Sequence, residues 1–194
     1  MTTVDTRIRI LEAAVACVER WGLAKTSIED VATEAGLSRA TVYRYFGGGR
    51  DELVTETIGW EVAKYLGRLA DAVEPERGIE DKLVRGLVFG HQAIDDHLLL
   101  QRVLSTEAEL FLADFHPVMP VMAELLRAEA LRLLADEQLR PGIDAEEAAG
   151  YVTGQFLSYL GSPGQWDLAD ERSVRRLVRT QFLAGILAPA PERT

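Results

Sequence analysis

The apolar residues of this chain recur every three or four positions along most of its length, and this spacing predicts amphipathic helices. The first stripe consists of Ile8, Leu11, Val15 and Val18 and ends at Gly22. Alternating runs of β-branched and polar residues, which would predict strands, are absent from the sequence. We therefore expect an all-α fold of about nine helices.

Glycine and proline residues mark the ends of the predicted helices. After the first stripe, helices are expected at 26–35, 38–46, 50–73, 79–94, 97–112, 117–137, 145–160 and 168–187. Three consecutive glycines, Gly47 to Gly49, interrupt the pattern after the third helix. The sequence thus predicts an amino-terminal three-helix domain at 1–49 and a carboxy-terminal helical domain at 50–194.

The second and third helices are predicted to form a helix-turn-helix, in which two helices are joined by a short turn containing glycine. Residues 26–29, with the sequence TSIE, have a capping-box pattern that starts the first of these helices. Gly36 suits the left-handed conformation that ends a helix, and Ser38 is a good N-cap for the next one.

The third predicted helix has one apolar side and one side suited to reading DNA. Val42 and Phe46 lie within about 40° of each other around the helix and must pack inward. The outward arc presents Ala40, Thr41, Tyr43 and Arg44. Arginine grips guanine edges, threonine meets bases and tyrosine hydroxyls suit phosphates, so this arc favours a recognition helix in the major groove.

The segment resembles the tetracycline-repressor (TetR) family of bacterial one-component regulators across about residues 7–55. The matching residues are Thr26, the run 28–32 (IEDVA), the run 35–38 (AGLS), the run 41–46 (TVYRYF) and the run 51–53 (DEL). The resemblance implies a DNA-binding transcriptional regulator, commonly a repressor, that needs no cofactor and is not an enzyme. The DNA-binding residues it implies, together with the outward arc, are Thr26, Ser38, Arg39, Ala40, Thr41, Tyr43, Arg44, Tyr45 and Arg50.

One position departs from the family pattern. The family often has a basic residue where Gly49 stands, just before the fourth helix. Arg50 either takes over that phosphate contact one residue later, or the contact is missing.

The charge distribution confines DNA binding to the amino-terminal segment. The chain has a formal net charge of −10, of which residues 1–50 contribute +1 (7 basic, 6 acidic) and residues 51–194 contribute −11 (14 basic, 25 acidic). The acidic segment 51–194 therefore repels polyanions such as DNA. The charged start of the chain and the lack of a long apolar run predict a cytoplasmic protein with no membrane segment. A single cysteine excludes a disulfide framework and a cysteine-cluster zinc site.

The body is expected to bind a small, mostly apolar effector. Sites for small molecules are largely apolar with a few polar groups, often between the helices of a bundle. The candidate ligand-binding residues are Phe89, Gln92, Phe111, Phe115, His116, Met119, Met122, Tyr151, Gln155, Phe156, Tyr159 and Trp166. An ordinary helical core would carry the same aromatic residues, so this alternative stays open.

The last two predicted helices are expected to form an interface between two copies. Residues 148–164 contain no charged side chain in 17 positions, and the segment 182–187 is apolar around most of its circumference. The candidate interface residues are Tyr151, Gly154, Ser158, Val178, Phe182 and Ile186. A homodimer would suit a palindromic DNA operator, whereas the alternative is a monomer in which both helices are central.

Two other function classes remain open. His91, His97 and His116 could belong to a metal or acid–base cluster, although their spacing matches no common metal-ligand motif. A small helical enzyme using His91 or His116 is therefore one alternative, and a helical protein-interaction module is the other. We expect no metal site.

Overall fold

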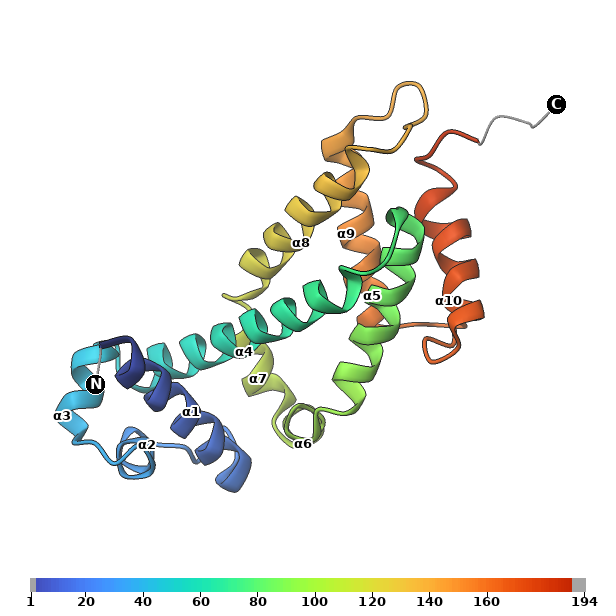
Figure 1. Ribbon diagram of the computed structural model, residues 1–194. Helices are drawn as coiled ribbons and strands as arrows, with labels where there is room; N and C mark the ends of the chain where they lie inside the picture. The colour runs from blue at the N-terminus through green and yellow to red at the C-terminus, as the bar shows by residue number, and fades with distance from the viewer. Residues whose placement is uncertain (1–2, 190–194) are drawn as a thin grey trace. The chain divides into compact units, whose positions relative to one another are not determined.

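The computed structural model describes residues 3–189, including all side chains in that range except those of Thr3, Leu98, Leu99, Arg102 and Leu104. This part of the chain consists of ten α-helices and one π-helix (Figure 1). They are α1 (Thr3–Trp21), α2 (Ile28–Glu34), α3 (Arg39–Tyr45), α4 (Arg50–Val73), α5 (Gly78–Asp95), α6 (Leu98–Thr106), α7 (Ala108–Phe115), α8 (Met119–Leu134), α9 (Ala145–Gly161), α10 (Glu171–Leu177) and η1 (Val178–Leu183). The predicted all-α class is confirmed.

Two of the predicted helices differ from the observed ones. The helix expected at 97–112 is divided into α6 and α7, because the chain changes direction at Glu107, which has φ −138° and ψ 31°. The helix expected at 168–187 begins at Glu171 and widens into the π-helix η1. These two changes account for the difference between the expected nine helices and the observed set.

The helices group into two compact units. The first contains α1, α2, α3, the part of α4 up to Leu66, and α6 and α7. The second contains the rest of α4, together with α5, α8, α9, α10 and η1. This grouping places α6 and α7 with the amino-terminal helices, whereas the sequence places a domain boundary between residues 49 and 50.

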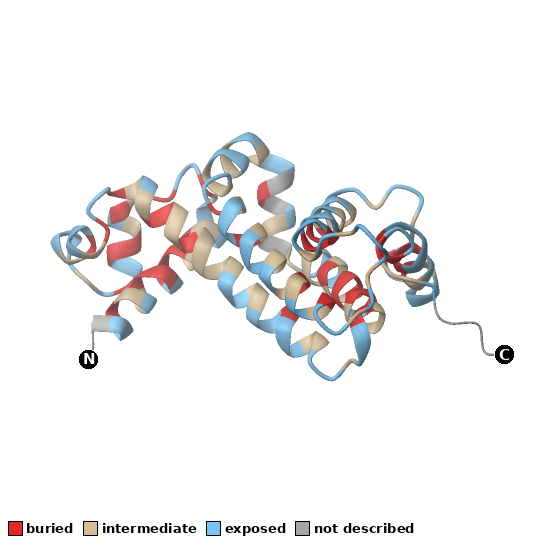
Figure 2. Cartoon of the chain, turned by 90° about the horizontal axis from the view of Figure 1, so that it is seen from above, coloured by how far each residue is buried: buried red, intermediate tan, exposed pale blue. Residues whose placement is uncertain are grey.

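The core of the first unit lies where α1 packs against α2 and α3. Ile10, Cys17, Val31, Val42 and Phe46 each have 0% of their surface exposed. In Figure 2 the buried residues form stripes along single sides of these helices. The three- and four-residue spacing of the sequence thus produces one shared apolar centre.

The core of the second unit brings α5 against α9 and against the last helices. A Cβ atom at Gly86 would lie 3.2 Å from the Cε2 atom of Phe156, so glycine at this position allows α5 to approach the ring closely. Val174, Val178 and Phe182 are fully buried. The apolar side of α10 and η1 is therefore covered by the chain itself.

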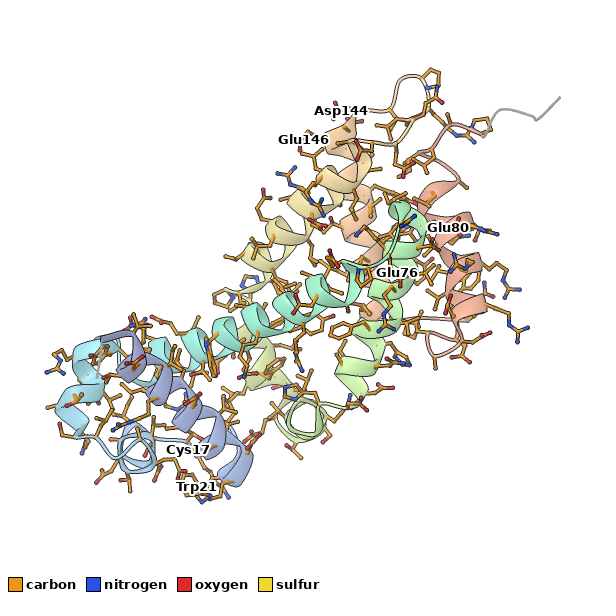
Figure 3. All side chains as sticks on the ribbon, viewed as in Figure 1. Cys17, Trp21, Glu76, Glu80, Asp144 and Glu146 are labelled. Carbon is orange, nitrogen blue, oxygen red and sulfur yellow. The ribbon has the colours of Figure 1, made fainter. Side chains whose placement is uncertain are left out.

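Ion pairs fasten α10 to the start of α5. The Arg175 guanidinium donates to Glu80 at 2.9 Å and to Asp81 at 2.5 Å, and Arg179 donates to Glu80 at 2.9 Å. Glu80 is labelled on α5 in Figure 3. The hydrogen bond from Arg179 lowers the pKa of Glu80, so this carboxylate stabilises the fold at neutral pH and loses that contribution as the pH falls through its lowered pKa.

Candidate nucleic-acid interface

The first helix of the predicted helix-turn-helix begins one residue later than its sequence pattern indicates. Ser27 is the N-cap of α2, and it forms a reciprocal capping box with Asp30. Thr26 is not the cap: only 4% of its surface is exposed, and its hydroxyl donates to the Gly22 carbonyl at 2.8 Å. The Thr26 hydroxyl therefore serves the preceding loop, and the assignment of Thr26 as a DNA contact stays a prediction.

The turn between α2 and α3 has the predicted geometry. Gly36 has a φ of +61°, in the left-handed region that side chains disfavour. Its carbonyl accepts a hydrogen bond from Arg9 of α1 at 3.2 Å. Ser38 then caps α3, with its hydroxyl oxygen accepting from the Thr41 amide at 3.1 Å. The turn is thus fixed at both ends and from α1.

Helix α3 divides into a buried side and an exposed side as its sequence predicts. Val42 and the adjoining Phe46 are fully buried. Tyr43 has 45% of its surface exposed, and Arg44 is exposed with its guanidinium carbon 5.5 Å from the centre of the Tyr45 ring. Of the other predicted contacts on or beside this helix, Ser38, Arg39 and Ala40 are exposed, while Thr41 and Tyr45 are half-buried.

A single arginine of α1 holds the carboxyl end of α3. The Arg7 guanidinium donates to the Tyr45 carbonyl at 3.0 Å and lies 4.6 Å from the centre of the Phe46 ring. It also pairs with Glu56 of α4. A charged donor at the end of a helix satisfies a carbonyl that has no partner within the helix, so Arg7 fixes where α3 ends against α1 and α4.

Arg50 does not point outward as a phosphate ligand. Its Nε donates to the Thr26 carbonyl at 3.0 Å and its Nη2 donates to the Leu23 carbonyl at 2.7 Å. Of the two alternatives for the basic residue missing at Gly49, these contacts favour an absent phosphate contact over a replacement by Arg50, because the Arg50 guanidinium is held by the loop at 22–27. Gly49 itself has a φ of +73°, so a lysine or arginine there would be strained.

The same loop is held from its other side by α7. The Glu107 carboxylate accepts hydrogen bonds from the Leu23 amide at 2.7 Å and from the Ala24 amide at 3.2 Å. Burial raises the pKa of Asp114, further along α7, and the charge of Arg50 partly offsets that effect. The loop that leads into α2 is therefore bound by two side chains: the carboxylate of Glu107, just before α7, and the guanidinium of Arg50, at the start of α4.

Most basic side chains of this module are occupied by the module itself. Of the seven basic residues in the first 50, five bind its carbonyl or carboxylate groups: Arg7, Arg9, Arg20, Arg39 and Arg50. Among the described residues, Lys25 forms no ion pair, and Arg44 only stacks on Tyr45. The cations left for a polyanion are few and lie on or beside α2 and α3.

The sequence of this module matches known regulators. Residues 10–57 match the profile of the bacterial regulatory proteins, tetR family. Over 189 aligned residues the chain is 27% identical to the helix-turn-helix transcriptional regulator BetI 2 of Chromohalobacter salexigens, covering 91% of this chain and 88% of that protein.

Over residues 10–57 the chain is thus similar to the TetR family of bacterial regulatory proteins.

Solved structures of other transcriptional regulators share the fold. One from Mesorhizobium loti superposes with a TM-score of 0.65 at 20% identity, covering 97% of this chain and 100% of that chain. FadR from Bacillus subtilis, solved in complex with stearoyl-CoA, superposes with a TM-score of 0.57 at 16% identity, covering 89% of this chain and 97% of that chain.

The predicted ligand residues have different environments. Phe111 and Phe115 of α7 stack with ring centres 5.3 Å apart. In the second unit Met122 and Phe156 are buried, and Tyr159 packs 5.7 Å from the Phe182 ring. Of the remaining candidates, Phe89, Met119 and Trp166 are half-buried.

The polar ligand candidates are less enclosed than expected. Gln92 and His116 are exposed. Tyr151 has 44% of its surface exposed and donates its hydroxyl hydrogen to the Gln181 carbonyl of η1, while Gln155 donates to the Tyr151 hydroxyl at 2.9 Å. Tyr151 is thus bonded to η1 and Gln155 to Tyr151 of the same helix, and their assignment as ligand contacts stays a prediction.

The predicted dimer residues fall into two groups. Tyr151, Gly154 and Ser158 lie on an exposed side of α9, as an interface requires. Val178 and Phe182 are fully buried and Ile186 is 6% exposed, because they pack into the core of their own unit. The second group is therefore corrected: these side chains are not available to a second copy.

No arrangement for catalysis is found among the described residues. His91 lies 3.4 Å from Asp95 within one helix, and His97 caps α6 by accepting from the Leu100 amide. No group of three metal-ligating side chains is found in residues 3–189. Burial raises the pKa of the Cys17 thiol to about 11, so it stays protonated and is a poor nucleophile (Figure 3). None of the described helices is long and apolar enough to cross a membrane.

Replacing Glu107 with alanine should loosen the loop at 22–27. The carboxylate makes two hydrogen bonds to amides and does not cap its own helix. We expect the free energy of unfolding to fall by about 1–3 kcal/mol and the Leu23 and Ala24 amides to exchange faster with solvent. Denaturant unfolding and amide hydrogen exchange measure the two effects.

Glu109→Ala is the matched control, because Glu109 lies on the same helix and is exposed. Equal losses in the Glu107 and Glu109 variants, with unchanged exchange at Leu23, would show that the loop does not depend on this carboxylate.

Proposed function

We propose that this chain is a TetR-family regulator that binds a palindromic DNA operator as a homodimer, and that a small, mostly apolar effector controls its operator affinity, with repression as the resting state. The observation that carries the proposal is the division of α3 into a buried side, Val42 and Phe46, and an exposed side. The exposed residues Arg39, Ala40, Tyr43 and Arg44, with the half-buried Thr41, form the reading surface.

The chemistry of this exposed side supports base reading more than general attraction to phosphate. Tyr43 and Arg44 combine a hydroxyl with a guanidinium that can bind guanine O6 and N7. The module has few unoccupied cations, so the phosphate contribution to affinity is small and contacts to bases must supply much of the binding. A regulator of this kind discriminates strongly between operator and other DNA.

Dimerisation is proposed through α9. Added Cβ atoms at Gly150, Gly154 and Gly161 would meet nothing within 4 Å, so this side of the helix is open. Small residues allow two helices to approach closely, and a second copy of α9 with its neighbouring η1 would complete a four-helix contact. A twofold dimer would also place two copies of α3 on successive major grooves.

The effector is proposed to be apolar because the body contributes aromatic and methionine side chains and few enclosed polar groups. The structural neighbour FadR was solved with stearoyl-CoA, which makes long-chain acyl compounds reasonable first probes. An effector changes operator affinity only if it binds the DNA-competent and DNA-incompetent arrangements with different affinities. The Glu107 contact to the loop at 22–27 is the described link between α7 and the helix-turn-helix.

The other function classes have no observation in their favour. The pair formed by His91 and Asp95 has no third group beside it, and His116 is exposed, so neither histidine is part of a catalytic arrangement among the described residues. A protein-interaction role for α3 would give no enriched sequence in a selection from random duplex oligonucleotides, whereas the proposed function gives a single inverted repeat.

Replacing Arg44 with alanine should weaken binding to the selected operator. One guanidinium that reads a base contributes about 1–3 kcal/mol and sets preference at one position. Tyr43→Phe should weaken all sequences alike, because the hydroxyl meets phosphate. Fluorescence anisotropy at fixed salt, with operators altered one base pair at a time, measures both effects.

Arg172→Ala is the control for charge, since the Arg172 side chain is 97% exposed on α10. Normal operator binding by both α3 variants would show that α3 does not enter the groove.

Replacing Gly154 with glutamate should separate the dimer. A charge in the middle of an uncharged helix contact costs several kcal/mol when it is buried without a partner, so we expect a monomer that has lost operator affinity while the amino-terminal helices stay folded. Sedimentation velocity and circular dichroism provide the measurements. The matched control is Gly67→Glu, at another exposed glycine with no neighbour within 4 Å. A wild-type chain that is monomeric at micromolar concentration and yet binds its operator fully would contradict the proposal.

Stearoyl-CoA should stabilise the protein and release it from DNA. A ligand at about 100 times its Kd adds about 2.7 kcal/mol to the free energy of unfolding. Thermal unfolding and anisotropy of labelled operator, each over a series of acyl chain lengths, test the two effects together. Coenzyme A without an acyl chain is the control, and it should do neither. Stabilisation by acyl-CoA with unchanged operator affinity would contradict coupled regulation.

A further inference from the structure

The basic residue at the start of α3 is held by an acidic residue of α2. The Arg39 Nη1 atom lies 3.2 Å from the Glu29 Oε2 atom. Both side chains are accessible, with 59% of Arg39 and 70% of Glu29 exposed. Arg39 is also the first residue of α3, at the end of a recognition helix that enters the groove. The pair therefore lies at the edge of the reading surface, where Arg39 can meet either a base or a phosphate.

Given the proposed DNA-binding function, on which this inference rests, we propose that Glu29 is a specificity-determining residue. It raises the ratio of operator affinity to random-DNA affinity by competing with phosphate for Arg39.

The physical basis is the difference in charge between the two targets. A DNA phosphate is an anion, so it must displace the Glu29 carboxylate from Arg39 or lie beside it, and the two anions repel each other. A guanine edge is a neutral acceptor. It can take the guanidinium donors that Glu29 leaves open, because arginine has five N–H groups and the pair uses Nη1. Glu29 thus weakens the phosphate contact, which every DNA sequence offers. It leaves Arg39 able to bind a guanine edge, which only some sequences offer at that position.

The rest of the module makes this competition significant. Besides Arg39, four of its seven basic residues bind its own carbonyl or carboxylate groups. Arg39 is one of the few that could add to non-specific binding, which depends almost entirely on phosphate contacts. An element that disfavours the wrong partner increases specificity even where it adds nothing to the affinity for the right one.

The test compares Glu29→Gln with wild type on the selected operator and on a random duplex of equal length, over a series of salt concentrations. Glutamine keeps the size of the side chain and removes its charge. We expect random-duplex affinity to rise roughly threefold to thirtyfold, since two exposed ion pairs per dimer no longer compete. Operator affinity should rise by less, so the specificity ratio falls.

The dependence of DNA affinity on salt concentration is a second measurement, and a change in the stability of the fold would not alter it. While Glu29 holds Arg39, this guanidinium makes no phosphate contact on random duplex. Without that carboxylate Arg39 gains one phosphate contact per protomer, so the slope of log affinity against log salt on random duplex should steepen by about 0.9 per protomer.

Two further variants separate the proposal from a general charge effect. Glu12→Gln removes one negative charge from an exposed position of α1, and it should leave the specificity ratio unchanged. In an Arg39→Ala background, Glu29→Gln should no longer raise random-duplex affinity, because the guanidinium it releases is absent.

The outcomes distinguish this proposal from the function on which it rests. If no sequence is enriched in the selection, both are overturned. A clear operator with an unchanged ratio in Glu29→Gln, or an equal change in Glu12→Gln, overturns the role of Glu29 alone.

Discussion

The arrangement of the helix-turn-helix depends on how the loop at 22–27 is held. This loop joins α1 to α2, and its backbone is bound from two directions. The Arg50 guanidinium takes two of its carbonyls, and the Glu107 carboxylate takes two of its amides. Each side chain satisfies backbone groups that have no partner in a helix. The direction in which α2 starts, and with it the position of α3, therefore follows from contacts made by α4 and α7.

This constraint changes what the arginines of the module do. A positively charged amino-terminal segment suggests attraction to DNA, yet Arg7, Arg9 and Arg50 bind backbone carbonyls. Guanidinium groups suit this role because they stay charged and carry several donors in a fixed plane. Most of the module's positive charge thus fixes its own geometry. Arg44 and Lys25 remain for a partner, and Arg39 is paired with Glu29. Its selectivity must depend on where these few groups lie.

In the second unit, too, charged side chains bind other groups of the same unit. Its last helices bury their apolar side in their own unit and are fastened to α5 by Arg175 and Arg179. The exposed side of α9 has instead small residues and a tyrosine that is bonded to η1. Between Gly150 and Gly161 this open side carries no charge, as a contact with a second copy of the same helix requires. This is why dimerisation is proposed there and not through the buried side chains of η1.

The sequence by itself determined the helical class, the helix-turn-helix, the bounds of α4 and the buried side of α3, because each follows from local periodicity, caps or glycine turns. Val42 and Phe46 are buried and Gly36 adopts a positive φ, as their spacing and residue types predict. Only the tertiary structure decided the roles of Thr26, Arg50 and Glu107. Their partners are backbone carbonyls and amides, which every residue carries and which therefore leave no sequence signal; Glu107 and the Leu23 amide are 84 positions apart. Likewise Val178 and Phe182 are apolar whether they face their own core or a second copy, and only the fold of the chain around them determines which.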